Sequence, residues 1–378
     1  MFQYAQCILR SLAHIQAQGE LEVVIAYGDA RWAPIISTFQ LPCTLLENWV
    51  LGSRVARLFM LLRIQATASR LLAERMNPLV QELHRLRCNL WIFPAQDELT
   101  WQVSGPVVAT IHDLMHRYER RFPEAGNWFR YGIREHRFYN LARRSTAVLV
   151  DSPMGKQHVL ESYGAVPERI HPLPYIAPSY IYEEGDQVRS DFDAHYKLPP
   201  KFYFYPAQFW QHKNHLRLIH ALADARRVYA DLTLVLAGGL RHEYASVHQL
   251  VLQRGLADAV RFVGYVPDAD MAGFYKRARG LVMPTFFGPT NIPPLEAMAL
   301  GCPVLVSNAY AMPEQCGDAA LYFNPNSVEE IRDQMIRLWN HDGLYEELSK
   351  QGLKRAQEWG QSQFQQCLDE ILAQTLTR

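Results

Sequence analysis

The chain has 378 residues, of which 49% are hydrophobic and 20% charged, and its 38 basic residues balance 38 acidic ones. This length suits two α/β cores, and the composition excludes disordered and fibrous proteins. Because the net charge is zero, nucleic acid is not expected as a partner of the whole molecule.

The cysteines favour a reducing cytoplasm, and the hydropathy pattern favours a soluble or peripheral protein. Six dispersed cysteines with no CxxC pair disfavour a disulfide framework and a structural zinc. No apolar run approaches the roughly 20 residues that a bilayer span needs, and the first residues do not resemble a signal peptide.

In chain order, the first half alternates helices and strands. A helical pattern through Ile8–Ile15 opens the sequence with no strand before it, so we expect the first strand of an α/β domain to be absent. Strands are expected at the following stretches: 21–27, 90–93, 107–111 and 147–150. Strands separated by helices predict a parallel sheet covered on both faces.

The proline-containing stretch Leu173–Pro200 is the predicted linker between two domains, residues 1–175 and residues 201–358. Beyond it the alternation resumes, which predicts a second doubly wound unit. Its strands are expected at 202–206, 232–237, 260–263, 280–284 and 303–307, with helices at 215–229 and 295–300.

Lys213 and Asn214 form the first candidate site, in a polar loop between a strand and a helix that begins at His215. Asn214 can cap this helix, and Lys213 lies where a cation meets an anion near a strand's carboxyl end. The alternative is a surface lysine beside a cap.

The second candidate site follows the strand ending at Pro284. Prolines open the next helix, and backbone N–H groups near Thr290–Pro294 are expected to point at an anion. Glu296, in the first helical turn, can accept hydrogen bonds from vicinal hydroxyls. Alternatively, Glu296 only complements the helix dipole.

His112, directly after the strand at 107–111, is the third candidate. At the carboxyl edge of a sheet, a histidine can donate to substrate oxygens or to a phosphate leaving group. A capping or core-edge role is the alternative.

Together these places resemble the retaining GT-B glycosyltransferases of family 4, the relatives of bacterial lipopolysaccharide and capsule sugar transferases. The resemblance covers nearly the whole chain. It is carried by these segments: Ile111–Leu114, Val150–Ser152, Tyr163–Ile170, Lys213–Asn214, Leu236–Gly239, Val260–Val266 and Pro293–Val304.

The resemblance implies two Rossmann-like domains facing a cleft, with the donor held mainly by the second. Lys213 would neutralise the diphosphate, His112 would contact the transferred sugar, and Glu296 would bind the ribose hydroxyls. Other residues expected to contact the donor are Gln208, Asn214, Gly239, Tyr265, Val266, Thr290 and Asn291. The family also implies a terminal helix, about 359–378, that returns to the first domain.

The resemblance implies no metal and no cofactor. Two Asp-x-Asp strings, Asp191–Asp193 and Asp268–Asp270, are interpreted as solvated loops because neither follows a strand. The chain departs from the family where Gly288 replaces a glutamate and Gln208 replaces a basic residue.

The predicted function is retaining transfer of a hexose or deoxyhexose from a GDP-, UDP- or dTDP-sugar to a surface glycan, free or lipid-linked. Two alternatives stay open: a nucleotide-sugar epimerase on the same scaffold, and a non-catalytic nucleotide- or glycan-binding homologue.

The stretch Trp49–Arg75 interleaves arginines with leucines and is predicted to be a basic amphipathic helix. Such a helix suits peripheral contact with the inner membrane, and the alternative is an ordinary surface helix docked on the sheet.

Overall fold

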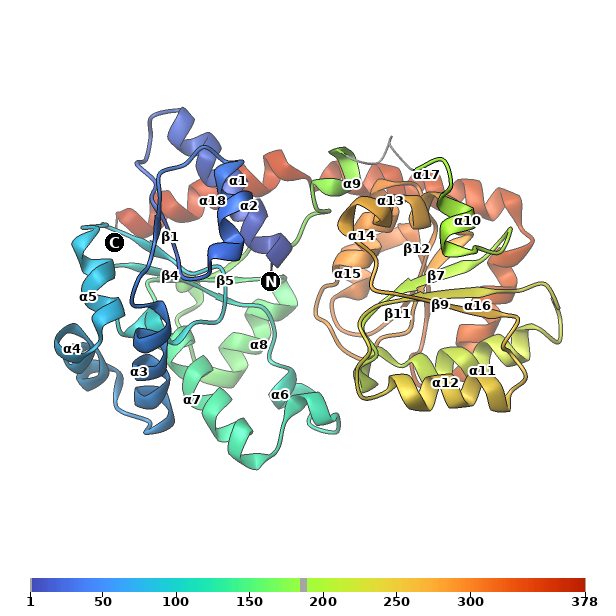
Figure 1. Cartoon of the computed structure of the whole chain (residues 1–378), viewed down its shortest axis with the longest axis horizontal. Coiled ribbons are helices and arrows are strands. Elements are labelled where there is room, and N and C mark those ends of the chain that lie inside the picture. Colours follow the sequence, from blue (N-terminus) through green and yellow to red (C-terminus); the bar gives the residue numbers. More distant parts are fainter. Residues whose placement is uncertain (1, 184–188, 378) are drawn as a thin grey trace. The chain divides into compact units, whose positions relative to one another are not determined.

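The computed structural model describes residues 2–183 and 189–377, and its contacts divide the chain into two compact units (Figure 1). The first unit contains Met1–Tyr118, Ala125–Pro174 and Gln361–Arg378, and the second contains Glu119–Glu124 and Tyr175–Gly360. The chain therefore passes between the units more than once, and the short segment 119–124 belongs to the second unit.

The first unit is built on a parallel four-stranded sheet in the order β3-β4-β5-β6. These strands are β3 (Trp91–Ile92), β4 (Val107–Ile111), β5 (Ala147–Val150) and β6 (Ile170–Pro172). Every residue of β4 and β5 is buried, as expected for parallel strands covered on both faces. A separate parallel pair joins β1 (Ile25–Tyr27) to β2 (Cys43–Leu45).

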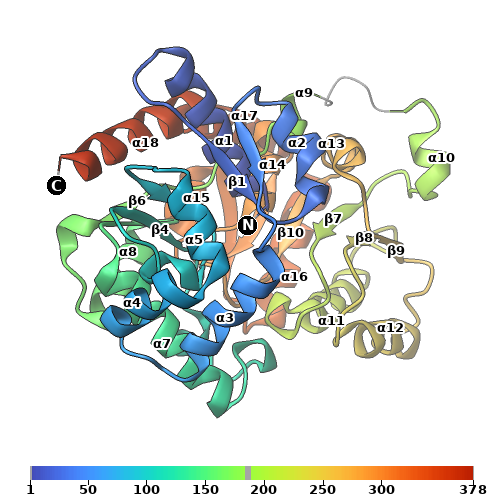
Figure 2. The same cartoon turned by 60° about the vertical axis from the view of Figure 1, so that its left-hand side comes forward.

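Helices cover this sheet, and the last helix of the chain packs against the first (Figure 2). Gln361 Nε2, at the start of α18, donates to Ser11 Oγ of α1 at 2.9 Å. The helices of the first unit are α1 (Phe2–Ala17), α2 (Ala33–Ser37), α3 (Trp49–Leu61), α4 (Ala66–Met76), α5 (Pro78–Arg85), α6 (Met115–Tyr118), α7 (Trp128–Arg144), α8 (Pro153–Tyr163) and α18 (Gln361–Leu376).

The predicted amphipathic helix over 49–75 is two helices. Leu62 ends α3, and Arg63 adopts a left-handed conformation with φ 52°, which an α-helix does not tolerate. The chain then turns into α4. Periodicity indicated helix throughout this stretch, but no glycine or proline marks the break.

The second unit has a parallel six-stranded sheet in the order β12-β11-β10-β7-β8-β9. Read outward from β7, this is the Rossmann order, in which the chain first winds to one side and then to the other. The strands are β7 (Tyr203–Pro206), β8 (Leu234–Ala237), β9 (Val260–Gly264), β10 (Gly280–Met283), β11 (Val304–Ser307) and β12 (Ala320–Phe323).

The helices of the second unit are α9 (Tyr180–Glu183), α10 (Phe192–Tyr196), α11 (His215–Ala225), α12 (Tyr244–Gln253), α13 (Asp268–Arg277), α14 (Ile292–Ala299), α15 (Met312–Cys316), α16 (Val328–Trp339) and α17 (Asp342–Glu358). The predicted linker contributes α9 and α10 to this unit. Phe192 and Tyr196 are buried and pack against Phe274 of α13.

The loop interpretation of the two Asp-x-Asp strings is wrong. Asp193 lies in the first turn of α10 and Asp270 in the first turn of α13, where acidic side chains complement the helix dipole. Asp193 forms an ion pair with Arg277, and Asp270 accepts a hydrogen bond from the Tyr196 hydroxyl. These contacts join the two helices.

Candidate active site

The topological switch point of the second sheet lies between β7 and β10, which are direct neighbours. From this pair the chain winds outward in opposite directions, and in such sheets ligands bind beyond the carboxyl ends of the strands at this point. Two loops occupy the position: residues 207–214 after β7 and residues 284–291 after β10.

Hydrogen bonds tie the two loops together. The Phe286 amide donates to His212 O at 2.8 Å, and Asn214 Nδ2 donates to Pro284 O at 2.9 Å and to Pro325 O at 2.8 Å. Asn214 occupies the N-cap position of α11 with φ 62°, but its side chain makes no capping bond. The Asn214 side chain therefore does not cap α11 as predicted, and instead forms buried hydrogen bonds that link loops.

Lys213 and Asn291 come together across these loops. Lys213 Nζ donates to Asn291 Oδ1 at 3.2 Å, although 78 residues separate them. The Asn291 amide donates to Gln315 Oε1 at 2.9 Å, and the Gln315 carboxamide in turn donates to Asn291 O. Gln315, which sequence reasoning did not identify, thus fixes the backbone at the start of α14. Thr290, next to Asn291, is also buried.

Gly288 adopts φ 144°, a region that favours glycine. A Cβ at this position would lie 2.4 Å from Asn291 Nδ2. The space that a glutamate would need is therefore occupied by the Asn291 side chain. The departure from the family pattern at 288 and the presence of Asn291 are parts of one arrangement.

Glu296 is buried in α14 and accepts hydrogen bonds from two tyrosines. The Tyr275 hydroxyl of α13 donates to Glu296 Oε2 at 2.6 Å, and the Tyr180 hydroxyl of α9 donates to Glu296 Oε1. Burial raises the pKa of Glu296, while these two hydrogen bonds act against the increase. Each carboxylate oxygen of Glu296 thus accepts from one tyrosine and retains capacity for a further hydrogen bond. Neither tyrosine was predicted, and no local signal marks them.

The other predicted donor-binding residues lie at the same edge of the sheet. Gln208 follows β7 and Gly239 follows β8, while Tyr265 and Val266 follow β9. The Gly238 amide donates to Gly264 O at 2.7 Å, which holds the ends of β8 and β9 together. The Tyr265 side chain is 77% exposed, whereas Val266 is buried.

Segment 119–124 also reaches the loop after β10. The rings of Phe122 and Phe286 are 5.3 Å apart, and the Arg121 guanidinium lies 4.7 Å from both ring centroids. Glu124 Oε1 accepts from the Gln211 amide at 2.6 Å, and the Tyr310 hydroxyl donates to Glu119 at 2.9 Å. Sequence reasoning placed this segment in the first domain, because the residues before and after it in the sequence belong to that domain.

His112 lies in the first unit, directly after β4, and is buried. Its Nε2 is 3.1 Å from Pro94 O, and its ring packs edge-on against Tyr4. Burial lowers the pKa of His112 to about 4, so the imidazole is neutral at pH 7. Asp113 Oδ1 accepts from the Met115 amide at 2.9 Å and so caps α6.

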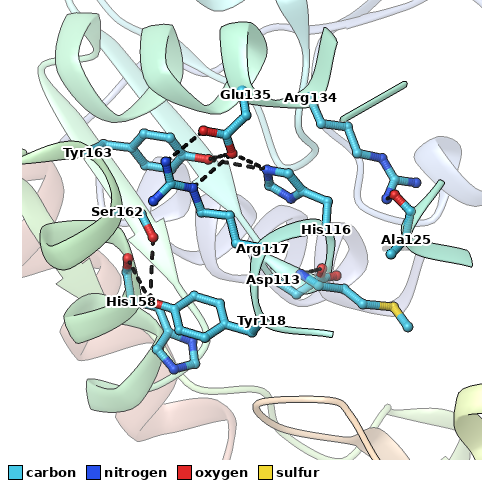
Figure 3. Close-up of polar contacts among 11 residues, drawn as sticks. Asp113, His116, Arg117, Tyr118, Ala125, Arg134, Glu135, His158, Ser162 and Tyr163 are labelled. Atoms are coloured by element: carbon cyan, nitrogen blue, oxygen red, sulfur yellow. Dashed lines mark hydrogen bonds and ion pairs between the residues drawn. The ribbon is translucent and has the colours of Figure 1, made fainter. Parts of the chain in front are cut away.

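A partly buried polar cluster anchors the helix that follows His112 (Figure 3). Glu135 of α7 accepts from His116 Nε2 at 2.7 Å, from Arg117 Nη2 at 2.7 Å and from the Tyr163 hydroxyl at 3.1 Å. The Tyr118 ring stacks on His158 of α8 at 3.8 Å. These contacts fix α6 on α7 and α8, and thereby restrict the backbone that carries His112.

Comparison with known proteins shows what this fold is similar to. An Anabaena protein, Alr3699/HepE, solved in complex with UDP and glucose, superposes with a TM-score of 0.73, covering 97% of this chain and 95% of its own at 16% identity. Residues 188–355 match the family model described as glycosyl transferases group 1.

Two curated relatives are sugar transferases. O-antigen chain mannosyltransferase B of Escherichia coli is 37% identical over 127 residues, 33% of either protein. O-antigen chain mannosyltransferase RfbU of Salmonella typhimurium is 29% identical over 216 residues, 54% of this chain and 57% of its own. The chain thus matches less than two thirds of either relative's length.

The two-unit architecture of parallel sheets confirms the predicted fold class, and its class is GT-B. Residues 188–355, which carry most of the second unit, match the group 1 glycosyltransferase family, and the chain is similar to lipopolysaccharide sugar transferases. Among the described residues, no helix is both long and apolar enough to cross a membrane.

Proposed function

We propose that this chain is a retaining glycosyltransferase that moves a hexose or deoxyhexose from a nucleoside-diphosphate sugar to a surface-glycan acceptor. The observation that carries the proposal is the pairing of Lys213 with Asn291 at the switch point of the second sheet. The mannosyltransferase names of the relatives support a hexose, and GDP, UDP and dTDP are the candidate donor nucleotides.

The chemistry follows from the charges that develop as the sugar-phosphate bond breaks. The sugar becomes positive and the diphosphate gains negative charge, so the Lys213 ammonium stabilises the transition state more than the ground state. Attack from the same face, within an ion pair, would retain the anomeric configuration without a metal. His112, neutral at pH 7, is proposed to contact the transferred sugar by a hydrogen bond.

Calorimetric binding of GDP, UDP and dTDP tests the donor site. In the variant Lys213→Met, we expect the preferred diphosphate to bind roughly 10- to 100-fold more weakly, because a charge-assisted hydrogen bond is lost. Lys350→Met is the control, since this exposed lysine lies on α17. Equal affinity in both variants would contradict the site.

Incubation with labelled nucleotide sugars separates the proposal from its rivals. Transfer to an acceptor with an unchanged anomeric configuration, measured by NMR, supports the proposal. Epimerised free donor that forms without any acceptor would indicate an epimerase. Binding without turnover of any donor would indicate a non-catalytic homologue.

We also propose a peripheral contact between α3, α4 and the anionic inner membrane. The two helices expose large apolar side chains, with Val50 62% and Leu62 64% exposed. The others are Leu51, Leu58, Leu61, Leu71, Leu72 and Met76. Arg54, Arg57, Arg63 and Arg75 are exposed among them, and α3 carries no acidic residue. Apolar side chains interleaved with arginines suit anionic lipid.

Sedimentation with vesicles tests this contact. We expect the chain to bind vesicles containing phosphatidylglycerol more than pure phosphatidylcholine vesicles, and less at high salt. The double variant L61S/L62S should lose binding, whereas L240S/L252S, which replaces exposed leucines of the second unit, should keep it. Equal binding by both double variants would refute the contact.

A further inference from the structure

The loops after β7 and β8 approach each other so closely that a side chain at Gly238 would not fit between them. Gly238, at the end of β8, has φ 142°, and a Cβ there would lie 2.3 Å from the carbonyl oxygen of Ala207. The Ala207 amide donates to Ala237 O at 2.8 Å, and the Phe209 amide donates to Gly239 O at 3.4 Å. Side chains carried by these two loops are therefore neighbours at the carboxyl edge of the sheet.

Gln208 and Arg241 meet across this contact. Arg241 Nε and Trp210 Nε1 each donate to Gln208 Oε1 at 3.0 Å. The Arg241 guanidinium also lies 5.3 Å from the centroid of the Trp210 ring. Within residues 2–183 and 189–377, no carboxylate forms an ion pair with Arg241, although its side chain is exposed. The arginine is thus held in place without being neutralised.

The chemistry of this pair suits a phosphate ligand. The neutral carboxamide oxygen of Gln208 orients the guanidinium without compensating its positive charge. A glutamate at position 208 would neutralise that charge. Of the Arg241 guanidinium, Nε donates to Gln208, and the two terminal amino groups keep donors that suit phosphate oxygens. Lys213 lies five residues after Gln208 on the same loop.

We propose that Arg241 is a second cation for the donor's diphosphate and that Gln208 and Trp210 position it. The positive charge that the resembled family carries at position 208 has moved to the loop after β8. This inference rests on the proposed donor site and adds a residue to it. Lys213 and Arg241 then share the charge of the leaving nucleoside diphosphate.

Calorimetric titration of the full chain with GDP, UDP and dTDP tests the inference. We expect Arg241→Gln to weaken the binding of the preferred diphosphate roughly 10- to 100-fold. The affinity should also depend less on salt concentration. Arg337→Gln is the control for overall charge, because Arg337 is exposed on α16. Thermal unfolding should be the same in both variants.

A rescue experiment separates a positioning role of Gln208 from a structural one. Gln208→Leu should weaken diphosphate binding several-fold, because Arg241 Nε loses its hydrogen-bond acceptor. Gln208→Arg, introduced into Arg241→Gln, should restore affinity by returning a cation to this edge. Failure of this rescue, or equal affinity of Arg241→Gln and Arg337→Gln, overturns the inference.

The same data distinguish failure of this inference from failure of the proposed function. If Lys213→Met weakens binding and Arg241→Gln does not, only the role of Arg241 is refuted. If the unaltered chain binds none of the three diphosphates, the donor site itself is refuted.

Discussion

Glu296 keeps a carboxylate in the core of the second unit because two tyrosine hydroxyls donate to it. An unsatisfied carboxylate at this depth would be costly, and burial already raises its pKa. The residue is therefore part of the packing as well as of the proposed donor site. Loss of a tyrosine hydroxyl should be measurable as a loss of stability.

We expect Tyr275→Phe to lower the free energy of unfolding by about 1–3 kcal/mol, the usual cost of a buried polar group that loses its partner. Tyr229→Phe is the matched control, because the Tyr229 hydroxyl makes no hydrogen bond in the described parts of the chain. Urea denaturation measures both. Equal stability of the two variants would show that the Tyr275 hydrogen bond contributes nothing.

Lys213, Asn291 and Glu296 could be chosen as candidates from the sequence because each follows a recognisable strand or begins a helix. The sequence did not indicate their partners. Tyr180 precedes Glu296 by 116 residues, and Gln315 follows Asn291 by 24, so only the folded sheet brings them together. Local patterns contain no information on such tertiary contacts.

At the scale of elements, the buried strands were predicted best. Val107–Ile111 and Ala147–Val150 match β4 and β5 exactly as expected, because β-branched runs between polar residues have few other interpretations. β6 was missed, since Ile170–Pro172 is short and contains a histidine and a proline. The break between α3 and α4 was also missed, because nothing local disfavours helix at Arg63.

The close contact between the loops after β7 and β8 gives an element-scale prediction. Gly238→Ala should destabilise the second unit by about 2 kcal/mol or more, because the new Cβ collides with backbone and φ is unfavourable. Gly239→Ala is the control, since a Cβ there meets nothing within 4 Å. Thermal unfolding compares them, and similar melting temperatures would contradict the role of Gly238.

At the scale of the whole molecule, buried histidines should dominate the response to moderate acid. Burial lowers the pKa of His112 and His116 to about 4, and of His212 and His215 to about 3. Unfolded histidines have a pKa near 6.5, so the unfolded chain binds more protons below that pH. Stability is then lost as the pH falls from about 6.5 toward 4. Asp97 acts in the opposite direction, because burial raises its pKa to about 6.

The expected result is a fall in the free energy of unfolding between pH 7 and pH 5, measured by urea denaturation. Among the groups with the largest shifts in this range, four histidines outweigh one aspartate, and each titrating group contributes up to about 1.4 kcal/mol per pH unit. His215→Phe should reduce the slope, because its ring stacks on Phe209 and needs no charge there. Constant stability over this range would contradict the prediction.

The repeated strand and helix alternation predicted two domains, and two segments lie elsewhere in the structure than predicted. The stretch 173–200, predicted as a linker, supplies α9 and α10 to the second unit. Segment 119–124 joins the second unit through Phe122 and Glu124, whose contacts depend on partners far along the chain. Composition cannot reveal that segment 119–124 belongs to the second unit, because its composition is that of an ordinary polar loop.

The excursion of residues 119–124 has a consequence for synthesis on the ribosome. This segment emerges before β7–β12 exist and has to wait for Phe286 and Gln211 to be translated. The first unit waits even longer, because α1 packs on α18, which is translated more than 300 residues later. Neither unit can therefore complete its core in the order of translation, because each is assembled from segments that lie far apart in the sequence.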